Sequence, residues 1–356
     1  MKISLHSKLV RALALIVIAA SALAHFIPRR GGAAAQKSLP YLDLSPNITK
    51  GLDLIGTNEP KAALTEARIG VFDGEKVLAM TLRDYLVGVT AAEMPAGYGI
   101  EALKAQAVAA RTFTVKHMTG ELRCKSGHTI CTDHRCCQAY ISVERMRANW
   151  GDGFEERYAK ICEAVDSTEN IVMTSDGALV TALYHSSSGG RTENCEAVFA
   201  VALPYLVSVE SAGEEDSPEY RSTVLFTKSE FNERINAAFP DAEMKEPSTD
   251  VEVWQRTESG RISLIRLGGT VVSGQQLRDA LSLKSTNVEF DIDGSTVEIS
   301  CLGFGHGVGM SQCGANAMAK EGADFETILK HYYTGVELET VVPETNIISI
   351  LCGASE

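Results

Sequence analysis

The sequence predicts an α+β fold in which mixed helices and antiparallel hairpins form a substrate groove. Two long segments carry apolar residues at helical spacing, and Asp-Gly or Ser-Gly pairs lie between short apolar runs, a pattern typical of hairpins. Strands and helices do not alternate regularly, which disfavours a parallel sheet. The chain has 356 residues, 45% of them hydrophobic, so it can bury one large core or two modest ones.

Composition suggests four segments and excludes one class of partner. The net charge of −13 and the lack of a Lys/Arg cluster argue against nucleic-acid binding, which needs a concentrated basic surface. The expected segments are an N-terminal membrane anchor, a linker, a catalytic region and a C-terminal tail: residues 1–30, 31–66, 67–342 and 343–356. The catalytic region can form one body or two lobes, 67–212 and 213–342.

Residues 1–30 have the pattern of an anchor or an export segment. Basic residues precede a mainly apolar run, residues 12–27, which is marginal for a membrane span of about 20 residues. If Arg11 snorkels and the two apolar residues before it are counted, a single-pass helix results. Its basic N-terminus would stay inside, which places the rest of the chain outside the cytoplasm. A signal-peptidase site at residues 22–24 is the alternative.

The catalytic region is expected to begin with a hairpin and two helices. Residues 68–80 contain two short apolar runs around an Asp-Gly pair, which predicts a hairpin. Thr81 then caps a first helix, and a second helix follows over about residues 99–118. The apolar face of the first helix consists of Leu82, Tyr85, Leu86 and Val89.

Glu93 belongs to this apolar face, four residues after Val89. Pro95 disfavours helical geometry at Met94, so Glu93 lies in the last turn of the helix. Burial and the negative end of the helix both raise the pKa of a carboxyl group there, as a general acid requires. The alternative is a helix-end glutamate that a buried donor satisfies.

The second helix carries Lys104 and Arg111, seven residues apart. At 1.5 Å per residue they lie on one face, about 10 Å from each other. The alanines around them allow close packing against a neighbour and leave the long cationic side chains at a seam. We expect both to bind substrate, and a solvated helix face is the alternative.

Residues 124–140 contain four of the nine cysteines and two histidines. This density favours a metal, and zinc is the default ion for thiolate and imidazole ligands. A closed set of four ligands would make that zinc structural. Structural disulfides in an exported domain are the alternative. The adjacent Cys136 and Cys137 would be hard to bridge to each other.

A helix over residues 153–168 and a hairpin over 171–184 are expected next. The hairpin ends in the loop HSSSGGRTE, whose glycines let the backbone approach a ligand closely. A tight polar turn is the alternative, and a serine nucleophile lacks the GxSxG context. The sugar-binding candidates in this loop are His185, Ser186, Ser187, Ser188 and Arg191.

The C-terminal half is expected to mix helices and hairpins. Its glycine-rich stretch GFGHGVG lacks the offsets of a phosphate-binding loop. The glycines permit an irregular loop that brings His306, Ser311 and Gln312 toward the groove, although a structural turn would have the same composition. Core packing is the expected role of Tyr332 and Tyr333. The expected helices are 226–239, 273–281 and 324–333, and the expected hairpins are 251–267 and 288–301.

Five ordered motifs carry a specific resemblance: AAEMP, EALKAQAVAARTF, YHSSSGGRTEN, PYLVSVES and GHGVGMSQCGANAMAKEG. The stretch from Ala79 to Leu338 resembles the stage II sporulation protein D family, membrane-anchored lytic transglycosylases of endospore formers. The resemblance implies that Glu93 is the catalytic acid/base and that Lys104 and Arg111 are needed for activity. It also favours the uncleaved membrane anchor.

The resemblance also bears on the zinc ligands. Related sequences often carry a His, then a Cys, then adjacent His-Cys followed by Gln-Ala-Tyr, whereas Cys136 here stands at the usual His position. We expect a structural zinc ion, with His134 or Cys124 as substitutes for a member of the ligand set. The expected ligands are His128, Cys131, Cys136 and Cys137.

Together these features predict an enzyme that cleaves the β-1,4 bond between N-acetylmuramic acid and N-acetylglucosamine in denuded glycan strands. The expected products are 1,6-anhydro-muramoyl ends, and the expected partners are peptidoglycan, the stage II sporulation amidase and its membrane complex. The expected location is the cell membrane, with the catalytic domain between mother cell and forespore. Two alternatives are a non-catalytic wall-binding module that stimulates an amidase and a serine hydrolase that uses the HSSSGG loop.

Overall fold

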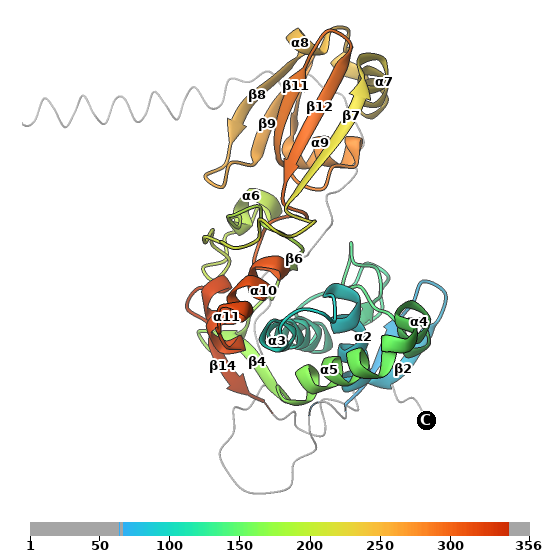
Figure 1. The fold of residues 1–356 in the computed structure, drawn as a ribbon, viewed down its shortest axis with the longest axis vertical. Coiled ribbons are helices and arrows are strands. Elements are labelled where there is room, and N and C mark those ends of the chain that lie inside the picture. Colours follow the sequence, from blue (N-terminus) through green and yellow to red (C-terminus); the bar gives the residue numbers. More distant parts are fainter. Residues whose placement is uncertain (1–63, 65–66, 342–356) are drawn as a thin grey trace, which may run out of the picture. The chain divides into compact units, whose positions relative to one another are not determined.

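The computed structural model describes residue 64 and residues 67–341 (Figure 1). Every element described below belongs to one compact unit of the chain. The expected anchor lies outside the described residues. None of the helices within the described part is long and apolar enough to cross a membrane.

The N-terminal elements form as the local sequence predicts. β1 (Arg68–Phe72) and β2 (Val77–Thr81) pair in antiparallel fashion around a turn in which the Asp73 carboxylate accepts the backbone N–H groups of Glu75 and Lys76. β3 (Ile130–Cys131) pairs in parallel with β1. Thr81 Oγ1 accepts the Asp84 N–H at 3.0 Å and starts α2 (Leu82–Glu93).

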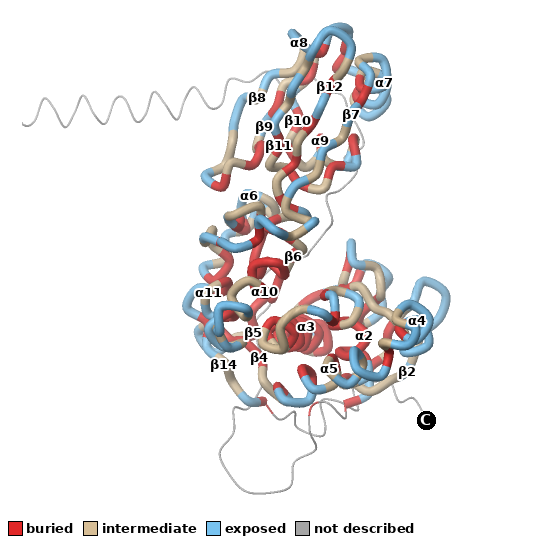
Figure 2. The backbone as a smooth tube through the Cα atoms, in the orientation of Figure 1, coloured by how far each residue is buried: buried red, intermediate tan, exposed pale blue. Residues whose placement is uncertain are grey.

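The helix α3 (Ile100–Met118) lies at the centre of the first of two hydrophobic cores. Figure 2 shows it buried along most of its length. Its alanines are fully buried, and these small side chains let α2, α5, α10, α11 and β4 pack closely around it. The other elements of this core are α4 (Val143–Trp150), α5 (Phe154–Asp166), β4 (Ile171–Ser175), β5 (Ala178–Leu179), β6 (Tyr184–His185), α6 (Cys195–Phe199), β13 (Met310–Ser311), α10 (Gln312–Lys320), α11 (Phe325–Tyr332) and β14 (Glu337–Thr340).

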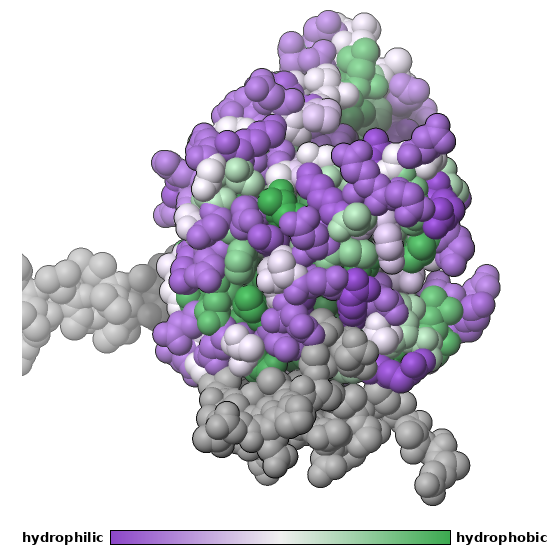
Figure 3. All heavy atoms as spheres, turned by 60° about the horizontal axis from the view of Figure 1, so that its bottom comes forward, coloured by the Kyte–Doolittle hydropathy of each residue, from purple (hydrophilic) through white to green (hydrophobic). Residues whose placement is uncertain are grey.

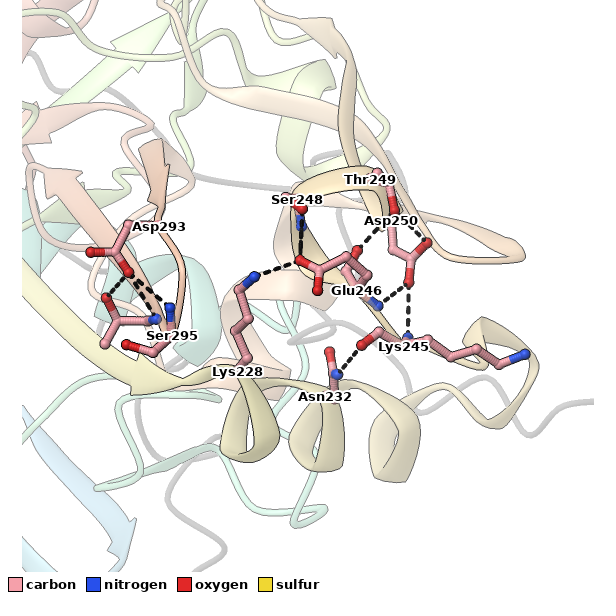
Figure 4. Close-up of polar contacts among 10 residues, drawn as sticks. Lys228, Asn232, Lys245, Glu246, Ser248, Thr249, Asp250, Asp293 and Ser295 are labelled. Atoms are coloured by element: carbon pink, nitrogen blue, oxygen red, sulfur yellow. Dashed lines mark hydrogen bonds and ion pairs between the residues drawn. The ribbon is translucent and has the colours of Figure 1, made fainter.

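The second core lies between two three-stranded antiparallel sheets and their helices, with sheet orders β10-β9-β8 and β11-β12-β7. Polar contacts fix the ends of its elements (Figure 4): Lys228 lies 2.6 Å from Glu246, and the Asp250 carboxylate accepts two backbone N–H groups. Its elements are β7 (Arg221–Thr227), α7 (Lys228–Ala238), α8 (Pro247–Asp250), β8 (Val251–Arg256), β9 (Ile262–Leu267), β10 (Thr270–Ser273), α9 (Gly274–Leu281), β11 (Asn287–Ile292) and β12 (Thr296–Leu302).

Mixed helices and antiparallel sheets make this an α+β protein, as the sequence predicts. The first core takes residues from 64–206 and again from 308–341, and the second takes residues from 226–301. Tyr332 and Tyr333 are core residues, 1% and 0% exposed. The face seen in Figure 3 is mainly hydrophilic, with hydrophobic residues in separate patches. The substrate groove and the domain boundaries stay predictions.

Candidate functional site

The last residue of α2 is Glu93, because Met94 adopts extended backbone geometry (φ −122°, ψ 140°) before Pro95. The apolar face of α2 is buried, which draws the end of the helix toward the core. The Glu93 side chain itself is half-buried. Glu93 therefore lies at the end of the helix, where the sequence analysis expects an acid.

Two hydrogen bonds reach the Glu93 carboxylate. The Ala139 N–H donates to Oε1 at 2.8 Å, and the Gln312 amide donates to Oε2 at 3.4 Å. Burial raises the pKa of Glu93, and these hydrogen bonds partly oppose that shift. Within the described part of the chain, no second carboxylate contributes to the shift.

The Ala139 donor reaches Glu93 because its segment packs tightly against α2. The Tyr140 ring stacks on Tyr85 at a centroid distance of 5.8 Å, and Ile141 N–H donates to the Gly88 carbonyl at 3.2 Å. A side chain at Gly88 would place its Cβ 2.2 Å from the Tyr140 ring. Glycine at this position therefore allows the segment to lie against the helix that carries the acid.

Lys104 and Arg111 have different environments. The Lys104 ammonium lies 2.7 Å from Glu101 and remains partly exposed. Arg111 is 0% exposed, and its guanidinium donates to the carbonyls of Val165 and Ile171 at 3.0 and 3.2 Å. These hydrogen bonds occupy Arg111 donors inside the protein. The surroundings of Arg111 therefore favour a structural role over substrate binding.

The HSSSGG loop directs its hydroxyls inward. The Ser187 hydroxyl donates to Glu214 Oε2 at 2.5 Å, and the Ser188 hydroxyl donates to Glu214 Oε1 at 2.7 Å. Ser187, Ser188 and Glu214 are each at most 1% exposed. Ser186 is half-buried, and exposed Arg191 lies 3.8 Å from Glu210. Within this loop, Ser186 and Arg191 are therefore the candidates that solvent can reach.

The two candidate histidines lie next to each other, with His185 buried and His306 half-buried. The centroids of the His185 and His306 rings are 5.7 Å apart, and His185 Nδ1 donates to the Val308 carbonyl at 3.1 Å. Burial lowers the pKa of His185 to about 3 and that of His306 well below its usual value, so both are neutral at pH 7. Among the described residues no hydrogen bond joins His185 to a serine hydroxyl, which argues against a serine nucleophile.

Ser311 and Gln312 begin α10. Ser311 is fully buried and caps the helix by accepting the Gly314 N–H at 3.2 Å. The next residue, Gln312, reaches both Glu93 and Gln106, with its amide 3.3 Å from Gln106 Oε1. Of the substrate-binding candidates, Gln312 is therefore the one hydrogen-bonded to the acid.

Four thiols gather beside β3. The Sγ atoms of Cys124, Cys131, Cys136 and Cys137 all lie within 4.8 Å of one another. The Cys124–Cys136 and Cys136–Cys137 distances are 3.7 and 3.8 Å, close to the ~3.8 Å edge of a tetrahedron with Zn–S bonds of ~2.3 Å. The eight cysteines in the described part are free thiols, so none of them forms a disulfide there.

This cluster corrects the expected ligand set at one position. His128 is exposed, and its ring stacks on Phe72 at 4.4 Å instead of joining the thiols. Cys124, the expected substitute, completes the cluster. The four side chains that could hold an ion here are therefore all cysteines, and bound zinc stays a prediction.

Two neighbours of the acid were missed from the sequence. Gln138 is buried, and its amide donates to the Tyr184 hydroxyl at 3.0 Å. Gln138 directly follows Cys137, and Tyr184 directly precedes His185, so both adjoin predicted site residues. Their residue types gave no signal, because a Gln is usually exposed and a Tyr next to apolar residues usually packs against the core.

The fold and the site define an α+β protein in which one half-buried carboxylic acid accepts hydrogen bonds from a backbone N–H and a side-chain amide, and in which four thiols form a cluster. The SpoIID family, described as Stage II sporulation protein, matches residues 73–175. The chain belongs to the stage II sporulation protein D family, as the relatives below show.

The chain is 36% identical over 265 residues to Stage II sporulation protein D of Bacillus subtilis (strain 168), which covers 74% of this chain and 76% of that protein. It is 37% identical over 259 residues to the protein of the same description from Bacillus amyloliquefaciens, with 72% and 74% covered. It is also 30% identical over 302 residues to a protein of Bacillus subtilis (strain 168) described as Amidase enhancer, with 71% of this chain and 40% of that protein covered.

Proposed function

We propose that this protein is a lytic transglycosylase that acts on peptidoglycan during sporulation. Its family relationship supports a role at the cell wall. The observation that carries the proposal is the state of Glu93, whose raised pKa and partial exposure suit a group that gives and takes one proton. The proposed substrate is the denuded glycan strand, which we propose binds in a groove at Glu93.

The reaction needs one acid/base because the substrate supplies the nucleophile. Protonated Glu93 donates its proton to the β-1,4 glycosidic oxygen between N-acetylmuramic acid and N-acetylglucosamine, and that C–O bond breaks. The resulting carboxylate takes the proton of the muramoyl C6 hydroxyl, whose oxygen bonds to C1 and closes the 1,6-anhydro ring. Most glycosidases use a second carboxylate, and none contributes to the pKa shift of Glu93.

The test is the variant Glu93→Gln, which keeps the shape of the side chain but cannot titrate. We expect loss of at least about 100-fold in the cleavage of denuded glycan, since general acid catalysis contributes on the order of 10²–10⁴. Glu156→Gln, on the exposed face of α5, is the matched control and should cleave at the wild-type rate. A folded Glu93→Gln protein with near wild-type cleavage would contradict the assignment.

A wall-binding module that stimulates an amidase is the second candidate function. The relative described as Amidase enhancer supports it. Such a module would bind glycan strands and raise the activity of an added sporulation amidase without cutting the strands itself. Glu93→Gln would then stimulate the amidase as well as the wild type does, and neither protein would release glycan products.

The remaining proposals concern zinc, location and partners. Cys124, Cys131, Cys136 and Cys137 would hold a structural Zn²⁺ ion, which would stabilise the segment that leads to Ala139. Residues 1–30 would anchor the chain in the cell membrane by a single helix, with the catalytic domain in the space between mother cell and forespore. There the stage II sporulation amidase and its membrane complex would supply denuded strands. Recovery of that amidase with the chain from sporulating membranes tests the partnership.

A further inference from the structure

The loop between β12 and β13 leaves one aromatic ring exposed. Phe304 is 37% exposed, and among the large apolar side chains exposed in the described part of the chain it is the one outside the helices and strands. Its backbone is held by two hydrogen bonds to Ser187, at 2.8 and 3.0 Å. Gly303 and Gly305 flank it, and a Cβ at these positions would lie 2.6 and 2.7 Å from atoms of the HSSSGG loop. Glycine on both sides therefore lets the backbone approach that loop closely, while the ring stays outside.

One lysine is held beside this ring. The Lys284 ammonium lies 4.9 Å from the centroid of the Phe304 ring and 3.0 Å from the Glu219 carboxylate, and its side chain is 39% exposed. The Lys284 carbonyl accepts the Gly305 N–H at 2.9 Å, which fixes the lysine backbone next to the ring. An ammonium group has three donors, and Glu219 is the acceptor they have within the described residues. The remaining donors are therefore available to a ligand.

Hydrogen bonds connect this pair of side chains to the proposed catalytic acid. Gln312 donates to Glu93, and the next residue, Cys313, donates its N–H to the Ser186 carbonyl at 2.9 Å. The residue after Ser186 is the one that bridges to Phe304. Consecutive Cα atoms are about 3.8 Å apart and those of bonded segments about 5 Å, so the Phe304 backbone lies within about 15 Å of Cys313. A glycan strand bound at Glu93 can therefore extend to the ring.

The ring and the ammonium suit one group of the denuded strand. The apolar face of a sugar packs well on an aromatic ring. N-acetylmuramic acid also carries a lactyl group whose carboxyl group forms the amide bond to the stem peptide, and hydrolysis of that amide leaves a carboxylate that is ionised at pH 7. The chain has a net charge of −13, so an anionic strand needs a cation placed locally. Lys284 supplies that cation beside the ring.

We propose that Phe304 and Lys284 form a subsite for denuded muramic acid, in which the ring stacks on the sugar and the ammonium binds the free lactyl carboxylate. This inference rests on the proposed function in so far as glycan strands are the ligand at Glu93. A strand that keeps its stem peptides has an uncharged amide at the lactyl group and cannot pair with the ammonium. Lys284 is therefore a specificity determinant that selects denuded strands without touching the reacting bond.

Binding of end-labelled glycan strands, measured by fluorescence anisotropy, tests the subsite. Each protein is the full chain in detergent and carries Glu93→Gln, so that the strands stay intact during the measurement. In this parent protein, Lys284→Met should weaken the binding of peptide-free strands about tenfold, since a hydrogen bond between charged groups contributes about that factor. Lys330→Met is the matched control and should bind like the parent, because the Lys330 ammonium also pairs with a glutamate, Glu326, at 3.5 Å and is exposed.

A modified strand gives a second comparison that does not depend on the folding of a variant. Strands whose lactyl carboxylates are converted to methylamides lose the charge but keep the sugars. The parent should bind them about tenfold more weakly than peptide-free strands, Lys284→Met should bind both equally, and Lys284→Arg, which keeps the charge, should retain the preference. Equal binding of the two strands by the parent, or an equal loss for both strands in Lys284→Met, would overturn the subsite.

The subsite and the proposed function can fail separately. With Glu93 intact, Lys284→Met should raise the KM for peptide-free strands about tenfold and leave kcat near the wild-type value, because Lys284 lies away from the reacting bond. If the wild type leaves glycan uncut but prefers the charged strands through Lys284, the subsite is supported and the transglycosylase activity alone fails. Normal cleavage with an unchanged KM in Lys284→Met would overturn the subsite and leave the proposed function standing.

Discussion

The substitution Arg111→Leu tests whether the Arg111 side chain supports the core or binds substrate. The sequence places it on a cationic face that binds substrate, whereas in the fold it is fully buried with two backbone carbonyls as acceptors. Replacing it by leucine keeps an apolar stem but leaves the Ile171 carbonyl without the guanidinium, while the Val165 carbonyl still accepts the Thr168 hydroxyl at 3.2 Å. One unpaired carbonyl costs about 1–3 kcal/mol. Removing the guanidinium recovers part of its own desolvation cost, so we expect a net loss of about 1–2 kcal/mol in the free energy of unfolding.

The assay is urea unfolding of Arg111→Leu beside Lys104→Leu. The expected result for Arg111→Leu is a lower midpoint at an unchanged m-value. Lys104→Leu removes a partly exposed ion pair with Glu101, so its stability should stay within about 1 kcal/mol of the wild type. A structural role of Arg111 would be refuted if Arg111→Leu unfolds like the wild type but binds glycan strands more weakly. The guanidinium would then contact the substrate and would not stabilise the core.

Three further outcomes follow from the site and its loops. Because burial raises the pKa of Glu93, the wild type loses stability as the pH rises through that pKa. Glu93→Gln should therefore have a higher urea midpoint than the wild type at pH 7. In acid, where Glu93 is protonated, the two midpoints should converge. Elemental analysis should find about one zinc per chain. Cys131→Ser should lose both the zinc and thermal stability, whereas the control Cys162→Ser should keep both. Full zinc occupancy in Cys131→Ser would exclude the thiol cluster as the zinc site. Gly309→Ala should lower the free energy of unfolding by at least about 2 kcal/mol, because the φ of Gly309 is +72° and a Cβ would lie 2.0 Å from the Leu183 carbonyl oxygen. Gly294 has open space around it, so Gly294→Ala should be nearly neutral in the same urea unfolding assay.

Local sequence signals predicted the local structure well. The Asp73 turn, the Thr81 cap and the alanine-rich helix over about residues 99–118 depend on contacts within a few residues, and the structure confirms them. β7 and α10 were missed for different reasons. β7 ends at Thr227, inside the helix expected over residues 226–239, so its last residues were assigned to that helix. α10 contains Gly314, which lowers helix propensity but is needed because a Cβ there would clash with Tyr332.

The composition of the site depends on contacts that no local pattern encodes. Gln312 reaches Glu93 across 219 residues of sequence, through the pairing of β13 with β6. The direction of a side chain at a loop or helix end is equally hidden, so the sequence could not tell that Ser187 and Ser188 donate inward to Glu214. The density of cysteines predicted that these thiols gather, but the presence of Cys124 instead of His128 in the cluster depends on which way the chain turns before β3.

The chemical identity of the glycan ends tests the central claim most directly. The purified full chain in detergent is incubated with peptide-free glycan strands in water labelled with ¹⁸O, and the products are analysed by mass spectrometry. We expect 1,6-anhydro-muramoyl ends, one water lighter than hydrolytic products and free of the label, because the proposed reaction uses Glu93 alone as acid and base and the muramoyl C6 hydroxyl as nucleophile. Reducing ends that carry ¹⁸O would contradict the account, since they require a group that activates water.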